Sequence, residues 1–184
     1  LVTVIITKEG DAQSFLQYNT AANGGGIYAN RGSVEFTDGN VDYNYASNNG
    51  GGMYVNDEGT LYMKGNAIMS RNHVPEGKDG GGVYLRGTIV VGEQVSNPAD
   101  LGVLLAEDNY AGDSYQYNDN ANNRNNIYLP EPQNPEVLTS HRDVITVIYN
   151  GISESSKVGF SVPRNYVPVI YCENNNVPCT EAGY

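Results

Sequence analysis

The chain has 184 residues, a formal net charge of −11 at pH 7 and a pI near 4.4, with 22 glycines, 15 tyrosines and no tryptophan. A chain this acidic is repelled by phosphate backbones and anionic lipid surfaces, which argues against nucleic acid as a partner. No apolar run approaches the roughly 18 to 20 residues that cross a bilayer, so we predict no membrane insertion in this segment.

The first predicted element is a strand over residues 1–7, where apolar residues and threonines follow one another. Neither an initiating methionine nor a signal peptide precedes it. We interpret the chain as a mature or excised part of a longer protein whose targeting segment lies outside it.

Three short motifs then return in the same order along the chain, and each reads as a short strand beside a turn. The first has the pattern apolar-x-x-Asn and begins at Leu16, Val41, Met69 and Ala106. The second has the pattern Gly-Gly-apolar-Tyr and ends at Tyr28, Tyr54 and Tyr84, with a degenerate copy that ends at Tyr128. The third is an alternating segment after a glycine, at residues 32–36, 59–63 and 87–91.

A period of about 27 residues with three short strands per repeat is typical of a parallel β-helix, and no window carries a helical stripe. We therefore predict an all-β fold, a right-handed single-stranded parallel β-helix, with about three to four rungs over residues 1–130. The longer step from Tyr84 to Tyr128 predicts an insertion near residues 95–104.

Alternation along each strand predicts which side chains face inward. The predicted core consists of Ile27, Val34, Phe36, Met53, Leu61, Met63, Val83, Ile89 and Val91. The tyrosines of the second motif fall on the opposite face, so we expect Tyr28, Tyr54, Tyr84 and Tyr128 to stand outside, one above another. The recurring asparagines mark turns, where stacked amides can bond each other and the backbone.

The pairing of Gly-Gly-apolar-Tyr with apolar-x-x-Asn resembles the repeats of polymorphic outer-membrane proteins and related adhesin-like β-helices of bacterial surface proteins. The usual forms there are GGA-[ILV] and F-x-x-N. This chain departs from them, because a glycine or tyrosine replaces the alanine and Leu16, Val41, Met69 or Ala106 replaces the phenylalanine. The resemblance covers roughly residues 14–130 and implies a secreted or cell-surface location.

The tail differs in composition, since Pro130, Pro132 and Pro135 interrupt the repeat. Apolar runs follow at residues 144–149, 157–162 and 166–171. We predict that residues 131–184 form a last rung and a C-terminal β cap. The spacing of Cys172 and Cys179 fits a small disulfide loop in an oxidising compartment, and two reduced thiols remain the alternative.

Many β-helices process polysaccharides, so the acidic residues need testing for catalysis. A glycosidase needs two carboxylates that face one sugar, and a lyase needs a basic residue. The candidate acids are dispersed along the chain. The basic residues are also scattered singly, at Lys64, Arg71, Lys78 and Arg86. His73 and His141 are solitary. The acids are Asp38, Asp42, Asp57, Glu58, Asp79, Asp108 and Asp113. We predict no catalytic residue, no metal site and no cofactor, and we leave calcium at acidic turns open.

The sequence thus predicts a non-catalytic, adhesin-like scaffold that binds host or matrix glycans or surface proteins through Tyr28, Tyr54, Tyr84 and Tyr128. Aromatic rows can stack on sugars or fill a protein interface. The same rings could instead stack on each other and stiffen the solenoid. A polysaccharide lyase or hydrolase and a purely structural spacer are the alternatives, and end-to-end self-association is left open.

Overall fold

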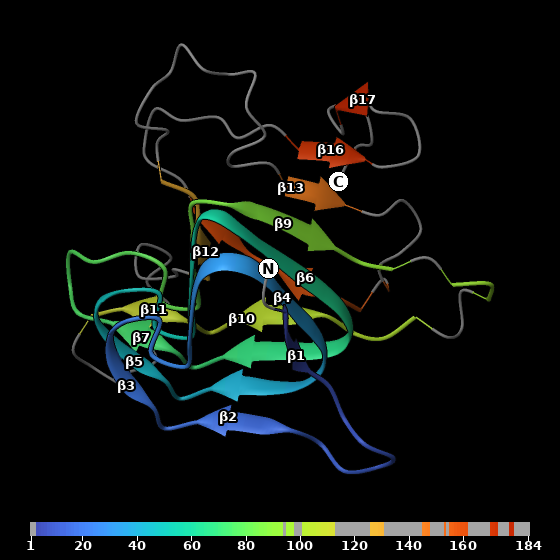
Figure 1. The fold of residues 1–184 in the computed structure, drawn as a ribbon, viewed down its shortest axis with the longest axis horizontal. Coiled ribbons are helices and arrows are strands. Elements are labelled where there is room, and N and C mark those ends of the chain that lie inside the picture. Colours follow the sequence, from blue (N-terminus) through green and yellow to red (C-terminus); the bar gives the residue numbers. More distant parts are fainter. Residues whose placement is uncertain are drawn as a thin grey trace.

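The repeated motifs form strands that stack from one coil to the next (Figure 1). The computed structural model describes residues 3–93, 95–97, 101–112, 126–130, 145–147, 153, 155–161, 170–172 and 177–178. None of these residues lies in a helix, so none forms a helix that could span a membrane. The strands build a parallel β-solenoid of about 3 turns, which confirms the predicted fold class. Its handedness stays a prediction.

The described strands form two sheets, one of 13 strands and one of 4. Their bounds in chain order are β1 Thr3–Ile6, β2 Phe15–Gln17, β3 Thr20–Asn23, β4 Ile27–Asp42, β5 Tyr45–Asn49, β6 Met53–Ser70, β7 His73–Val74, β8 Val83–Leu85, β9 Thr88–Val91, β10 Leu105–Glu107, β11 Tyr110–Ala111, β12 Ile127–Tyr128, β13 Ile145–Val147, β14 Lys157–Val158, β15 Phe160–Ser161, β16 Ile170–Cys172 and β17 Val177–Pro178.

Strands β4 and β6 show the path of a coil most clearly. Each of them runs continuously across three faces of its own coil, and the two coils pair in parallel. Their parallel register shifts at two bends, between Ala29 and Arg31 and between Phe36 and Asp38. The first face carries β8 and β12 beyond β6, the second carries β9 and β13, and the third carries β10 and β14. The alternating motifs therefore lie in register on each face, as their spacing predicts.

A fourth strand completes each coil and was not predicted. Strands β3, β5, β7 and β11 form the separate four-stranded sheet, which lies at the lower left of Figure 1. The apolar-x-x-Asn motif therefore ends a strand of the third face, and the residues after the asparagine begin a strand of the small sheet. The coil has four strands rather than three because the chain turns sharply at the residue before each asparagine. Those residues, Tyr18, Tyr43, Arg71 and Asp108, have φ angles of 58°, 55°, 56° and 58°.

The core occupies the inside of the coils and follows the predicted alternation. Eight of the nine predicted core residues are at most 2% exposed, and Leu85, Leu104 and Leu129 join them. Ile27 differs, because it is only partly buried. It lies on the lowest described strand of the first face, where β4 pairs only with β6, so no described coil covers its lower side.

A column of buried asparagines runs through the corner between the third face and the small sheet. Asn44, Asn72 and Asn109 are at most 1% exposed. The Asn72 backbone N–H and side-chain Nδ2 both donate to Asn109 Oδ1, at 3.0 and 2.9 Å, and Nδ2 also donates to the Val41 carbonyl at 2.8 Å. Asn19 and Asn44 repeat this pattern one coil below. We call the column of Asn19, Asn44, Asn72 and Asn109 the asparagine ladder. It satisfies backbone groups that no strand pairing reaches.

The asparagine ladder ends on a residue from another part of the repeat. Asn109 donates from its backbone N–H and from Nδ2 to Asn126 Oδ1, at 3.0 Å each. Asn126 precedes Ile127, which pairs with Val83, so Asn126 occupies the position that Gly82 has one coil below. A Cβ on Gly82 would lie 2.9 Å from the Asn109 amide, which is why the complete coils need glycine there.

Beyond residue 131 the described strands β13 to β16 continue the parallel pairing, and β17 does not. Strand β13 pairs with β9, β16 pairs with β13, and β17 pairs antiparallel with β16. Strand β9 ends at Val91 and β10 begins at Leu105, so the predicted insertion falls in the connection between them. The domain division at residue 130 and the β cap stay predictions. The disulfide does too, because Cys179 lies outside the described residues.

Candidate binding surface

The outward tyrosines of the first face form one continuous stack, which we call the tyrosine ladder: Tyr28, Tyr54, Tyr84 and Tyr128. Parallel pairing places each of these residues directly above the one before it. Successive ring centroids are 5.1, 5.0 and 5.7 Å apart. The first two spacings are close to the roughly 4.7–4.9 Å between strands, and the last is wider. The predicted row on one outer face is thus present.

The orientation of the rings determines what the ladder offers to a partner. Neighbouring rings are inclined by 23°, 14° and 25°, so each ring covers the face of the next. Sugars stack on an open aromatic face, and the inner rings of the ladder have none to offer. Tyr28, at the end of the ladder, is 52% exposed and stacks on Tyr54. The rest of the ladder presents ring edges and hydroxyl groups.

Charged side chains flank the ladder. Arg86 Nε lies 3.3 Å from Asp57 Oδ1. Burial acts to lower the pKa of the Arg86 guanidinium, but its hydrogen bond to Tyr54 and the charge of Asp57 produce a net upward shift. Burial, reinforced by Tyr54 and Asp79, raises the pKa of Tyr84 to about 12. The ladder hydroxyl of Tyr84 is therefore neutral across the physiological range.

An alkaline titration tests this environment of Tyr84. We expect the tyrosinate absorbance of the wild type minus that of Tyr84→Phe to rise with a midpoint of about 12 rather than 10.0, recorded after a rapid pH jump. Because the pKa is raised in the folded state, this group contributes stability that is complete below pH 10 and is lost as the pH rises through 12. A difference curve centred near 10 would contradict the partly buried, stacked position of Tyr84.

Two further columns accompany the tyrosine ladder and were missed from the sequence. On the small sheet, His73 lies between the rings of Tyr45 and Tyr110, at 4.8 and 5.1 Å. At the asparagine corner, Tyr18 stacks on Tyr43 at 5.2 Å, and the Arg71 guanidinium lies 4.5 Å from the Tyr43 ring centroid. The sequence did contain a positional signal for these columns, because their residues directly follow or precede the repeated asparagines. The residue types differ from repeat to repeat, so the pattern was not recognised.

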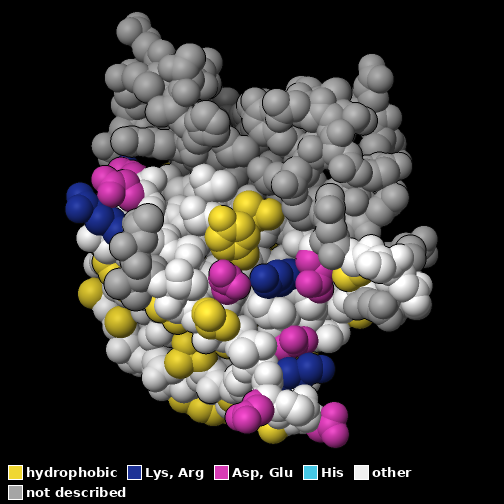
Figure 2. All heavy atoms as spheres, turned by 45° about the vertical axis from the view of Figure 1, so that its right-hand side comes forward, with side chains coloured by type: hydrophobic (Ala, Val, Ile, Leu, Met, Phe, Trp, Pro, Cys, Tyr) yellow, Lys and Arg dark blue, Asp and Glu magenta, His cyan; other side chains and the backbone are white. Residues whose placement is uncertain are grey.

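Three of the seven acidic residues considered for catalysis pair with an arginine of a neighbouring coil. Glu58 pairs with Arg31 at 2.9 Å, and Asp57 pairs with Arg86. Asp42, only 2% exposed, pairs with Arg71 at 3.2 Å. Figure 2 shows such neighbouring charges of opposite sign on the described part of one face. The described residues contain no group of three or more His, Cys, Asp or Glu side chains that could hold a metal.

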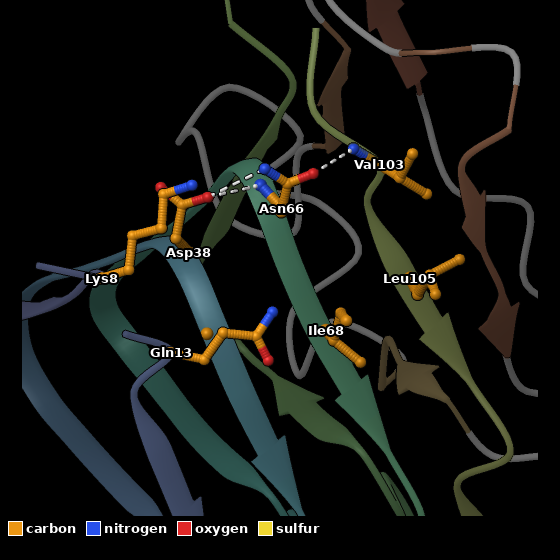
Figure 3. Close-up of a pocket in the computed structure, with 8 residues that line it drawn as sticks. Lys8, Gln13, Asp38, Asn66, Ile68, Val103 and Leu105 are labelled. Carbon is orange, nitrogen blue, oxygen red and sulfur yellow. Dashed lines mark hydrogen bonds between the residues drawn. The ribbon is translucent and has the colours of Figure 1, made fainter. Parts of the chain in front are cut away.

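A shallow groove of about 180 Å³ crosses the third face (Figure 3). Its lining residues are Lys8, Gln13, Asp38, Gly39, Asn66, Ile68, Val103 and Leu105. Its single carboxylate, Asp38, accepts hydrogen bonds from the Asn66 backbone N–H and Nδ2, each at 3.1 Å. Asp38 therefore has a structural partner and no second acid across the groove. Asp113 and His141 lie outside the described residues.

Comparison with protein-family models, curated proteins and solved structures found no match to this chain.

Proposed function

We propose that this chain is a non-catalytic, adhesin-like scaffold that is secreted or displayed on a bacterial cell surface. It binds host or matrix glycans or surface proteins along the first face of the solenoid. The observation that carries this proposal is the tyrosine ladder, a regular column of outward aromatic side chains on a rigid parallel sheet. The resemblance of the repeat motifs to adhesin-like β-helices supports the same assignment.

The geometry of the ladder favours one mode of contact. Tyrosine suits interfaces because it combines a rigid apolar ring with a hydroxyl and loses little conformational entropy on binding. In this chain the stacked rings leave edges and hydroxyls outside, at one set per coil. A partner with a periodic arrangement of hydrogen-bonding groups, such as an extended glycan or a strand-like protein segment, would meet them repeatedly.

The alternatives have less support. A polysaccharide lyase or hydrolase would need converging catalytic groups, whereas the described carboxylates Asp42, Asp57 and Glu58 each pair with an arginine. A purely structural spacer would use an outward aromatic column only to stiffen the solenoid through ring stacking. End-to-end self-association would use the ends of the coils rather than this face.

A glycan and matrix-protein array tests the proposal with graded variants. We expect single Tyr→Ala changes at Tyr28, Tyr54 or Tyr84 to weaken binding modestly and the triple change to abolish it. A triple Tyr→Phe change keeps the stack but removes the hydroxyls, so it should lose binding if edges and hydroxyls make the contact. Stability should fall by about 0.2–1 kcal/mol per residue, the range of a cross-strand contact between outward side chains.

Tyr62→Ala is the matched control, since Tyr62 is outward on the second face of the same strand β6. It should leave binding intact. If the folded triple Tyr→Ala variant gives the same array profile as the wild type, the ladder has a structural role and the proposed binding face is wrong.

A further inference from the structure

The stacked tyrosines include accessible oxidisable side chains of the described coils. The chain has no tryptophan, and its three methionines, Met53, Met63 and Met69, are fully buried. By contrast, Tyr18 is 73% exposed and Tyr28 is 52% exposed, and each stacks on a second tyrosine from the next coil. A one-electron oxidant in solution therefore meets tyrosine rings that already lie beside a second ring.

We propose that the tyrosine ladder and the Tyr18–Tyr43 pair are sites of oxidative dityrosine formation, in which a peroxidase acting with hydrogen peroxide joins successive coils covalently. This modification does not depend on the binding function proposed above. It requires that rings from neighbouring coils are held close together and can rotate until their edges meet.

The reaction balances as follows. Each of two tyrosines loses one electron and one proton and becomes a phenoxyl radical. The two radicals form one carbon–carbon bond between the ring carbons next to the hydroxyls, and the hydrogen on each of these carbons moves to its oxygen. One hydrogen peroxide accepts the two electrons and two protons and becomes two water molecules. The product retains both hydroxyls and is lighter than the two tyrosines by two hydrogen atoms.

Proximity decides which rings couple. Tyr54 and Tyr84 have centroids 5.0 Å apart and planes inclined by 14°. A radical on one ring is therefore held beside its partner, which makes coupling within the molecule far faster than an encounter between molecules. Bond formation requires the two stacked rings to rotate about their Cβ–Cγ bonds, so that the edges carrying the carbons next to the hydroxyls face each other across the strand spacing.

The same structure contains tyrosines that should not couple. Tyr45 on β5 and Tyr110 on β11 belong to one column but lie two strands apart, with the His73 ring of β7 between them. Tyr62 is outward and 38% exposed, and its register neighbours are Glu35 and Val90. Exposure alone would make Tyr62 reactive, whereas the stacking requirement leaves it without a tyrosine to join.

Peptide mapping after treatment with a peroxidase and hydrogen peroxide tests the proposal. Tryptic cleavage separates the ladder residues, because Arg31 lies between Tyr28 and Tyr54 and Lys64 lies between Tyr54 and Tyr84. We expect dityrosine fluorescence in the monomer and links at the stacked pairs Tyr28–Tyr54, Tyr54–Tyr84, Tyr84–Tyr128 and Tyr18–Tyr43. Fragment sequencing of the linked peptides locates each link, because Tyr18 and Tyr28 share the peptide 9–31 and Tyr43 and Tyr54 share the peptide 32–64. Tyr45–Tyr110 links should be absent. Tyr54→Phe should remove both links to position 54 and retain Tyr18–Tyr43.

A gain-of-function variant sharpens the test. His73→Tyr places a tyrosine between Tyr45 and Tyr110, so new links from position 73 to each of them are expected in the folded variant. The proposal is overturned if the wild type forms no dityrosine while a tyrosine peptide in the same reaction does. It is equally overturned if the links do not follow the stacked pairs, or match those of protein oxidised in denaturant.

Discussion

Replacing Asn72 with leucine is expected to lower the free energy of unfolding by about 2–6 kcal/mol. The Asn44 backbone N–H and the Val41 carbonyl lose this partner, at about 1–3 kcal/mol each, whereas Asn44 Nδ2 keeps its bond to the Leu16 carbonyl. Asn72 Oδ1 accepts from the Asn44 backbone N–H at 3.0 Å and from Asn44 Nδ2 at 2.9 Å. Leucine has a similar size but no acceptor, so both donors would lose this bond. Urea unfolding followed by circular dichroism measures the change.

An exposed asparagine pair provides the control for this prediction. Asn56 Nδ2 donates to Asn30 Oδ1 at 2.8 Å, which also joins two successive coils, but the pair lies in solvent. Water replaces such a bond when it is lost, so Asn56→Leu should change the unfolding free energy by less than about 1 kcal/mol. Similar losses for Asn56→Leu and Asn72→Leu would contradict the buried ladder as the source of the effect.

Replacing Leu61 with alanine is expected to lower the free energy of unfolding by about 2–5 kcal/mol, as a leucine-sized cavity does in a packed core. Leu61 is fully buried and lies between Val34 and Ile89 in the parallel register. The neighbouring coils are held by continuous strand pairing, so they cannot collapse far into the space. Denaturant unfolding of the variant beside the wild type gives the difference.

Tyr62→Ala is the matched comparison because Tyr62 is the next residue on the same strand and points outward. We expect it to cost about 0.2–1 kcal/mol, the range of a cross-strand contact. If alanine at position 62 destabilised the protein more than alanine at position 61, the inward and outward assignment of β6 would be reversed. A one-residue slip would have that effect on every side chain of the strand.

The asparagine and leucine variants probe different parts of the same stack. Leu61 contributes apolar burial on the second face, whereas Asn72 satisfies the backbone at a corner where the chain leaves sheet pairing. The two sites share no hydrogen-bond partner or register neighbour in the contacts described above. Their effects should therefore add in a double variant to within about 0.5 kcal/mol.

The repeat predicted the fold and the core because a solenoid converts sequence period into spatial neighbours. Residues one period apart, such as Val34, Leu61 and Ile89, lie on top of one another, and alternation places them on the same side. The position of the tyrosine ladder followed for the same reason. No long-range contact had to be guessed, since each coil pairs with the coils directly below and above it.

The exceptions occur where a residue's role depends on which coil lies beside it. Ile27 has the same alternation as Met53 and Val83 but lacks a described coil on one side, so it is partly buried. Asn126 occupies a glycine position of the repeat, yet its side chain completes the asparagine ladder. A period identifies equivalent positions, but it does not show which of them lies at the end of a stack.

The sequence by itself thus determined the strand register, the inward set and the side on which Tyr28, Tyr54 and Tyr84 stand. The tertiary structure decided how the rings are oriented, which residues of different type share a column, and that a fourth strand closes each coil. Ring orientation depends on side-chain torsions that adjust to the neighbouring coil. The column Tyr45, His73 and Tyr110 has no common residue type, so only the stacking of the coils brings it together.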